Sequence, residues 1–285
     1  MSSLELQGTL VERLRRAARL PAVVSGILEL ALEDAPAAEI ARGCESDLAL
    51  TARIVALANS RVLGARRPAR SLLAAATALG TNRVRNFALV CWLSDIFQGL
   101  DAAFPLKRYW RHAFLVAATC RGLLADDLAV SGEDLYLAGL IHDAGAAFLC
   151  GSLPGEYVRA LDLAREKRAP LRHVEQELFG IDHAGAIALA AESWALPDDV
   201  RAALDPGGSD APSPDGIIGR ALRRADAAAV RLGWGWQLED AGGAARTGSD
   251  SADPADLAAP HASHAQEVCR LLALLSGPRG ELRAR

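Results

Sequence analysis

A histidine and an aspartate stand side by side, His142-Asp143, in the most apolar part of the chain. The segment around them, Leu137 to Leu149, has apolar residues at helical spacing and predicts one helix. An imidazole and a carboxylate in such surroundings cost free energy unless both find partners. Neighbouring positions on a helix differ by only about 100° in direction, so the pair could bind one metal ion together. Alternatively, both side chains form hydrogen bonds to neighbouring helices and hold the core in register.

The composition predicts a protein with a large apolar core and no general affinity for nucleic acids. Of the 285 residues, 51% are hydrophobic, and the formal net charge at pH 7 is −4. This charge gives no basic excess for a phosphate backbone, so DNA binding is not expected. The five cysteines are odd in number, widely spaced and without a C-x-x-C pair, which is typical of buried thiols in a reducing cytosol.

No segment predicts a signal peptide or a membrane span. The N-terminus lacks an apolar run after a basic start, and no stretch of about 18 uninterrupted apolar residues exists. We therefore expect a cytoplasmic protein that does not associate with a membrane.

The elements that would position His142 and Asp143 are all helical, because no strand alternation of any length occurs. Turn and cap signals such as Pro21, Asp47 and Gly80 separate the helices of the first half. The predicted helices cover about 4–19, 22–32, 36–44, 47–59, 71–79, 82–97, 105–125, 137–149, 154–168, 170–179, 182–194, 197–204 and 217–231. We predict an all-α fold in which an N-terminal helical bundle packs on a second helical bundle.

A cluster of basic residues follows the predicted helix 47–59. Four arginines stand within ten residues: Arg61, Arg66, Arg67 and Arg70. Guanidinium groups bind phosphates and carboxylates through paired hydrogen bonds. The cluster is therefore a candidate contact for an acidic partner surface or a phosphate-bearing ligand, and the alternative is a solvated loop.

Several short blocks occur in order and at compatible spacing along the chain. They are Leu20-Pro21, the helix from Asp47 to Ala58-Asn59-Ser60, Leu79-Gly80, Trp110-Arg111-His112-Ala113, Ala138 to Gly145, Gly180 to Ala186, and Trp194 to Pro197. Taken together, these blocks resemble the HDOD domain, an HD-related output domain of bacterial signalling proteins.

The resemblance covers about residues 10–236. It implies an N-terminal helical subdomain, 10–103, followed by an HD-like subdomain, 104–236. Residues 237–264 are rich in Gly, Ala, Ser, Asp and Pro and predict a linker. We expect a C-terminal helix and tail in residues 265–285.

The resemblance also implies a metal site. HD-superfamily phosphohydrolases hold one metal ion with a His, a His-Asp pair and a distant Asp, and this chain has the same types in the same order. The implied ligands are His112, His142, Asp143 and Asp226. Two imidazoles and two carboxylates suit a divalent ion such as Mn, Fe, Ni, Mg or Zn. His183 is similar to an additional histidine of two-metal members and is a candidate for a position just behind the ligands.

The chain departs from the active HD hydrolases in two places. These enzymes commonly carry a lysine directly after the HD-x-G run, where this chain has Ala146. A cation there would neutralise a phosphoryl oxygen. The stretch after Trp194 to Pro197 lacks the expected pair of histidines, and the chain has no Gly-Tyr-Pro signature, so cyclic-di-GMP phosphodiesterase activity is not expected.

We therefore expect a non-catalytic regulatory module of signal transduction. It would act by binding a signalling protein or a nucleotide ligand. The alternative is a metal-dependent phosphohydrolase that acts on a nucleotide or another phosphate ester, with a metal-bound water as the nucleophile.

Overall fold

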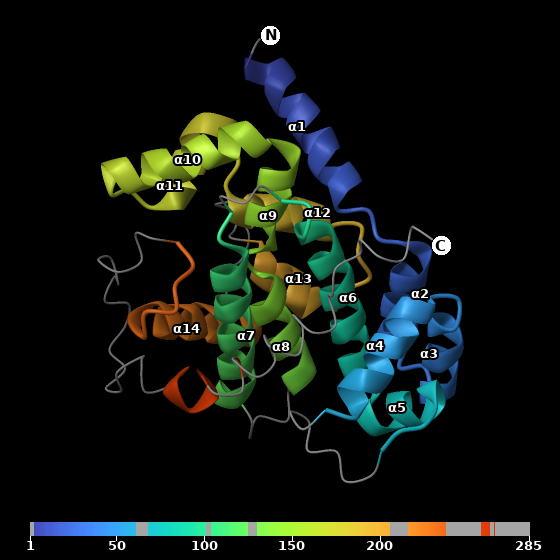
Figure 1. Ribbon diagram of the computed structural model, residues 1–285. Coiled ribbons are helices and arrows are strands. Elements are labelled where there is room, and N and C mark those ends of the chain that lie inside the picture. The colour runs from blue at the N-terminus through green and yellow to red at the C-terminus, as the bar shows by residue number, and fades with distance from the viewer. Residues whose placement is uncertain are drawn as a thin grey trace, which may run out of the picture. The chain divides into compact units, whose positions relative to one another are not determined.

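The computed structural model describes residues 3–60, 68–100, 104–124, 130–205, 216–237, 258–262 and 265. Within these ranges the chain forms only helices, turns and connecting segments (Figure 1). The predicted all-α fold is confirmed. The helices fall into two compact units, a larger one formed by residues 1–20 and 99–265 and a smaller one that contains residues 21–98.

The smaller unit is a bundle around an aliphatic core. Its helices are α2 (Ala22–Leu32), α3 (Ala37–Cys44), α4 (Leu48–Ala58), α5 (Leu72–Leu79) and α6 (Thr81–Phe97). The Asp47 carboxylate accepts a hydrogen bond from the Leu50 N–H and begins α4, and Ser71 begins α5 in the same way through the Ala74 N–H. Helix α5 packs on α3 and α4, and α2 packs on α6, so that Ile27, Ile40 and Ile54 are fully buried.

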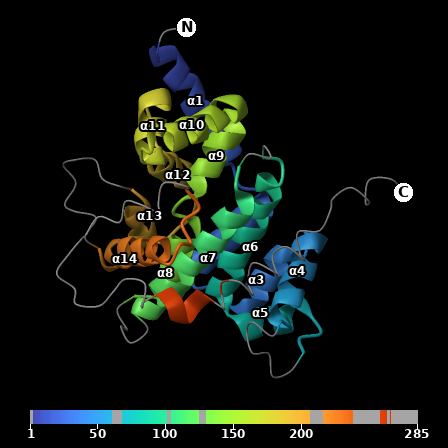
Figure 2. The ribbon, with the colours of Figure 1, turned by 60° about the vertical axis from the view of Figure 1, so that its left-hand side comes forward.

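The larger unit is built around a pair of helices in its centre. Its helices are α1 (Ser3–Ala17), α7 (Leu106–Leu123), α8 (Gly132–Ile141), α9 (Ala144–Ser152), α10 (Pro154–Lys167), α11 (Leu171–Phe179), α12 (His183–Ala191), α13 (Asp198–Leu204) and α14 (Ile217–Arg231). Helices α7 and α8 lie side by side and α14 crosses them, as both views show (Figures 1 and 2). Helices α9 and α12 form a second close pair.

The first helix belongs to the larger unit, although it precedes the smaller unit in the sequence. It packs on α9 and α12, and the indole Nε1 of Trp194 donates a hydrogen bond to the Ala18 carbonyl at 2.8 Å. The expected subdomain limits, 10–103 and 104–236, stay a prediction, because the compactness of a unit does not test whether it folds alone.

The prediction of one helix from Leu137 to Leu149 is wrong. Helix α8 ends at Ile141 and α9 begins at Ala144, with His142 and Asp143 in the turn between them. Each helix is fixed to a different neighbour through a glycine. A Cβ on Gly139 would lie 2.6 Å from the Cα of Ala117 in α7, and a Cβ on Gly145 would lie 1.9 Å from the His183 carbonyl oxygen in α12. The chain turns between the two glycines because α8 packs on α7 and α9 packs on α12.

The segment that contains α8 and α9 is as long and as apolar as a membrane-spanning helix. By length and composition alone, Gly132–Ser152 is apolar enough to cross a membrane. However, 72% of its most apolar 18-residue stretch is buried inside the structure. Its packing as the core of the larger unit accounts for its composition.

The predicted linker is described only in part. Residues 238–257 and 263–264 lie outside the described residues, and so does the predicted C-terminal helix and tail except for Ala265. Within the linker range, Ala259–His261 form a short 3-10 helix that packs on α7.

Candidate metal centre

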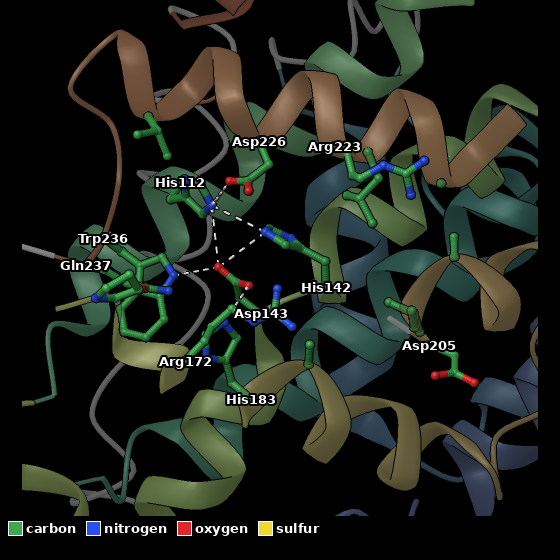
Figure 3. A pocket seen from close by; sticks show the side chains of 17 residues that line it. His112, His142, Asp143, Arg172, His183, Asp205, Arg223, Asp226, Trp236 and Gln237 are labelled. Carbon is green, nitrogen blue, oxygen red and sulfur yellow. Dashed lines mark hydrogen bonds and ion pairs between the residues drawn. The ribbon is translucent and has the colours of Figure 1, made fainter. Parts of the chain in front are cut away.

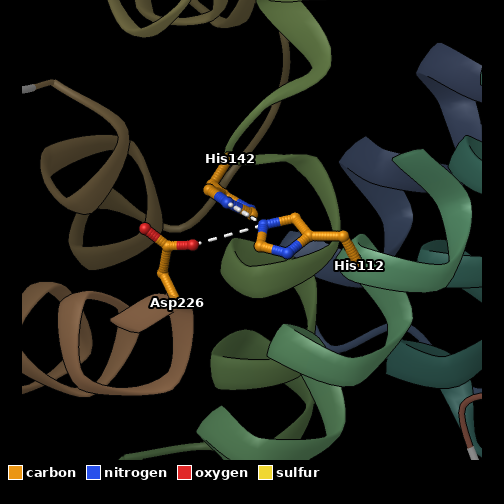
Figure 4. Close-up of side chains that lie close together, drawn as sticks. All are labelled: His112, His142 and Asp226. Carbon is orange, nitrogen blue, oxygen red and sulfur yellow. Dashed lines mark hydrogen bonds and ion pairs between the residues drawn. The ribbon is translucent and has the colours of Figure 1, made fainter. Parts of the chain in front are cut away.

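The structure brings the four implied ligands together in the larger unit (Figure 3). His112 comes from α7, His142 and Asp143 from the turn between α8 and α9, and Asp226 from α14. Potential ligand atoms of His112, His142 and Asp226 all lie within 4.8 Å of one another (Figure 4). The Asp143 Oδ2 atom lies 3.5 Å from His112 Nε2 and 3.2 Å from His142 Nε2.

The separations in this cluster fit the donors of one bound cation. His112 Nε2 lies 3.4 Å from His142 Nε2 and 3.2 Å from Asp226 Oδ1. Two ligands at about 2.1 Å from one ion lie roughly 3.0–3.4 Å apart when the angle between their bonds is 90–109°. His112, His142 and Asp226 therefore present two imidazoles and one carboxylate close enough together for a divalent metal site, and Asp143 lies against both histidines.

The backbone of α8 fixes the ring of His142. Its Nδ1 atom lies 2.9 Å from the Gly139 carbonyl oxygen, which can only accept, so Nδ1 carries the hydrogen and donates. In the neutral ring this leaves a lone pair on Nε2, the atom that faces the cluster. Metal-ligating histidines are commonly oriented by such a hydrogen bond from the other ring nitrogen.

The carboxylates hold a proton on His112 when no cation is bound. Burial alone would lower the pKa of His112, but hydrogen bonds and charges from Asp143 and Asp226 raise this pKa to about 10. The pKa of Asp143 lies well below its ordinary value, because the effect of His142, His112 and His183 outweighs the burial that would raise it. The cluster is therefore an ion network, buried at His112 and Asp143 and partly exposed at Asp226, in which the positive charge of a metal could replace that of the proton.

Trp236 contributes to the cluster and was missed in the sequence. Its indole Nε1 donates a hydrogen bond of 2.6 Å to Asp143 Oδ2, and its side chain is 1% exposed. In the sequence it lies five residues after the end of the predicted helix 217–231, in a stretch without periodicity. The only signal for it is a pair of tryptophans, Trp234 and Trp236, soon after the helix that carries Asp226.

A buried hydrogen-bond chain supports the cluster from behind. His183 lies next to Asp143, with its Nε2 atom 3.7 Å from Asp143 Oδ1. Its Nδ1 atom and its backbone N–H both donate to Glu175 Oε2, and the Tyr157 hydroxyl donates to Glu175 Oε1 at 2.6 Å. Burial would lower the pKa of His183, but the charge and hydrogen bond of Glu175 raise it to about 9. His183 thus lies against Asp143 and Glu175, and its expected place behind metal ligands stays a prediction.

The cluster lies in the wall of a cavity of about 420 Å³ (Figure 3). Arg172 from α11 and Arg223 from α14 also line this cavity. The Arg172 guanidinium pairs with the Asp182 carboxylate, with 2.7 Å between Nη2 and Oδ2. Two guanidinium groups therefore line the cavity, and that of Arg172 is already paired with a carboxylate.

Ala146 lies in the first turn of α9 and is fully buried. The position that resembles the lysine position of active HD hydrolases therefore contributes a methyl group to the core. Within the described residues, the arginines that line the cavity are Arg172 of α11 and Arg223 of α14, and the histidines of the cluster line it as well.

The arginine cluster of the smaller unit is described only at its end. Arg61, Arg66 and Arg67 lie outside the described residues, and Arg70 is exposed just before α5. The base of the segment is closed by Asn59. Its side-chain amide donates to the Ala69 carbonyl at 2.9 Å and accepts from the Ala69 N–H at 2.7 Å.

Comparison with known proteins gives a family match and several related folds. The model of the HDOD domain family matches residues 18–205. This range ends before Asp226 and Trp236. No curated protein matches the chain.

Among solved structures, an HDOD domain protein of unknown function from Geobacter sulfurreducens is similar, with 24% identity and a TM-score of 0.69 over 95% of this chain and 99% of the other. A protein from Marinobacter aquaeolei VT8, described as a signal transduction protein, has 19% identity and a TM-score of 0.70 over 95% and 69%. A protein from Shewanella amazonensis SB2B, described as a phosphohydrolase, has 22% identity and a TM-score of 0.67 over 93% and 98%. At these identities the likeness concerns the fold.

Proposed function

The chain belongs to the HDOD domain family, and on this premise we propose that it is a non-catalytic regulatory module of signal transduction. It acts by binding. The ligands are one divalent cation and a nucleotide or other phosphate-bearing molecule in the cavity, and the output is contact with a signalling protein. The Marinobacter structure of the same fold, described as a signal transduction protein, supports the signalling role.

The observation that carries the proposal is the burial of Ala146 in the core, in the first turn of α9 that follows His142 and Asp143. His112, His142, Asp143 and Asp226 would hold the cation, and the cavity gives a ligand access to it. Phosphoryl transfer depends on neutralising the charge of the transferred group. By resemblance to active HD hydrolases, this chain lacks the lysine that does so, which favours binding without turnover.

A metal-dependent phosphohydrolase is the second candidate, and one observation favours it. Arg172 and Arg223 line the same cavity as the ligands and could take over the neutralising role. In that case His112, His142, Asp143 and Asp226 would hold the metal, which when bound supplies an activated water. His183, held by Glu175, would orient groups beside the metal.

The two candidate functions differ in whether the protein releases phosphate from a bound ligand. The experiment incubates the purified protein with Mn²⁺ or Ni²⁺ and a panel of nucleotides, cyclic dinucleotides and aryl phosphates. We expect the melting temperature to rise with the cation and a nucleotide, without release of phosphate. The variant His142→Ala should lose the response to the cation, whereas His173→Ala, an exposed histidine on α11, should keep it. Metal-dependent hydrolysis that is lost in His142→Ala and kept in His173→Ala would establish the phosphohydrolase instead.

The protein contact is proposed for the arginine cluster of residues 61–70. Its exposed member, Arg70, and the fixed base at Asn59 and Ala69 support a surface role. Replacing Arg66 and Arg67 with glutamate should weaken capture of a signalling partner without lowering the melting temperature.

The cytoplasmic location also remains a prediction.

A further inference from the structure

The segment Gly233–Gln237 follows Leu232, the residue that caps α14, and leaves the helix through a defined motif. Gly233 has a positive φ of 73°, a backbone conformation that favours glycine. Its N–H donates to the Val230 carbonyl and the Trp234 N–H donates to the Ala229 carbonyl, both at 2.9 Å. This pair of hydrogen bonds is the Schellman motif, which ends a helix and satisfies its last carbonyls. The direction in which the segment leaves α14 is therefore set by the backbone.

Helix α7 holds this segment with two arginines. The Arg108 Nη2 atom donates to the Gly235 carbonyl at 2.9 Å, and the Arg111 guanidinium lies 4.7 Å from the centre of the Trp234 ring. Arg111 is the residue before His112, so the helix that carries a candidate ligand also holds the segment in place.

The segment ends in the core of the candidate metal centre. The ring of Trp236 lies 5.6 Å from Phe104 and 6.0 Å from Tyr109, measured between centroids. Its Nε1–H donates to Asp143 Oδ2, the same oxygen that faces His112 Nε2 and His142 Nε2 (Figure 3). One carboxylate oxygen is thus shared by the segment and by the candidate cation site.

We propose that Trp236 is a positioning residue of the cation site, and that its bond to Asp143 couples cation binding to the docking of Gly233–Gln237. This inference rests on the proposed cation binding. An ionised carboxylate oxygen has more than one lone pair, so Oδ2 can accept the indole N–H and face a cation at the same time. The bond fixes the carboxylate in the orientation that the cation requires. Cation binding and docking of the segment are thermodynamically linked. If docking of Trp236 raises the affinity for the cation by some factor, cation binding raises the equilibrium constant of docking by the same factor.

The test compares two neighbouring tryptophans. Trp236→Phe removes the N–H donor and part of the indole but keeps an aromatic ring in the cluster. Trp234→Phe makes the same change on the same segment, keeps a ring for Arg111 to contact, and is the matched control. Binding of Mn²⁺ alone is measured by calorimetry on the full chain. Hydrogen bonds to ligating groups typically account for about 10–100-fold in metal affinity. We expect Trp236→Phe to lose a factor in this range and Trp234→Phe to bind like the wild type.

A second measurement uses the unaltered protein and so does not depend on the folding of a variant. Hydrogen exchange of the amides in Gly233–Gln237 is followed with and without Mn²⁺, and we expect the cation to slow it. Wild-type affinity in Trp236→Phe, or exchange that Mn²⁺ does not change, would overturn the coupling and leave the proposed function standing. If the wild-type protein binds no divalent cation at all, the proposed cation binding fails and the coupling fails with it.

Discussion

The carboxylate of Glu175 lies 2.5 Å from the Nδ1 atom of His183, and its side chain has no contact with solvent. Its other oxygen accepts the Tyr157 hydroxyl at 2.6 Å. A fully buried carboxylate with three donors is held in one orientation, and it holds His183 in one orientation in turn. Helices α10, α11 and α12 are connected through this single side chain.

The first prediction concerns this connection. Glu175→Gln replaces one acceptor oxygen with an N–H₂ group, which has to face the donors of either His183 or Tyr157. A buried donor is then left without a partner, so the variant should lower the free energy of unfolding by about 2–4 kcal/mol. Tyr157→Phe loses one hydrogen bond and should lower it by about 1 kcal/mol. The exposed Glu177→Gln on the same helix is the control and should have no measurable effect. Urea unfolding measures all three, and equal stability of Glu175→Gln and Glu177→Gln would contradict the role of Glu175.

The second prediction concerns the close approach of α9 and α12. Gly145→Ala would place its Cβ 1.9 Å from the His183 carbonyl oxygen, where backbone has to shift. We expect a loss of about 3 kcal/mol or more and a weakened cation site, because the shift also moves Asp143. Gly155→Ala in α10 meets no atom within 4 Å and should leave the protein as stable or stabilise it by roughly 0.5–1 kcal/mol. Thermal melts of the two variants give the comparison, and a fully stable Gly145→Ala would disprove the packing described for α9.

The third prediction concerns removal of the cation. Dialysis against a chelator should lower the melting temperature, and Mn²⁺ at about 100 times its dissociation constant should restore roughly 2.7 kcal/mol of stability. Asp226→Asn removes the charge of a ligand and should abolish this response. Asp162→Asn, an exposed aspartate on α10, should retain it. A cation response in Asp226→Asn equal to that of the wild type would exclude Asp226 from the site.

The fourth prediction concerns pH and the start of α12. The Asp182 carboxylate accepts a hydrogen bond from the Gly185 N–H at 2.8 Å and from Arg172 Nε at 2.8 Å. Burial would raise the pKa of Asp182, but these hydrogen bonds and the charge of Arg172 lower it below 3.8. The folded state therefore favours the ionised form, and this stabilisation is present above pH 3.8 and is lost as the pH falls through the folded-state pKa.

Asp182→Asn isolates this effect, because asparagine also begins helices well but carries no charge. The wild type should be more stable than Asp182→Asn at pH 6, and the difference should shrink toward pH 3 and below. Denaturant unfolding at a series of pH values measures it. A difference that stays constant over this range would show that the charge of Asp182 contributes nothing.

The sequence predicts the polar pair at the centre of the fold but not the turn that contains it. His142-Asp143 stands out because both residues are polar in an apolar stretch. The break between α8 and α9 does not, since the stretch is apolar on every side and its periodicity carries no signal for an end. The position of the break depends on the close approach of Gly139 to Ala117 and of Gly145 to His183. These contacts join residues that are distant in the sequence.

Glu175 shows a second limit of sequence reasoning. It lies among charged residues on α11, a pattern typical of a solvated face, yet it is fully buried. Its burial depends on Tyr157, 18 residues earlier, and His183, 8 residues later, which a local pattern does not connect. Asp226 stands in an arginine- and alanine-rich helix and was identified only by family resemblance. Its proximity to His112 follows from how α14 packs on α7.

The paired hydrogen bonds between Asn59 and Ala69 make the segment between them exchangeable. These hydrogen bonds hold the two ends of that segment together, and α4 and α5 also pack on each other directly. Loop closure becomes only about 0.6 kcal/mol less favourable for each doubling of length, so longer or unrelated inserts should be tolerated there. The arginine sequence can therefore diverge between relatives, or be replaced by a peptide tag or a foreign recognition sequence, while the helices around it stay in place.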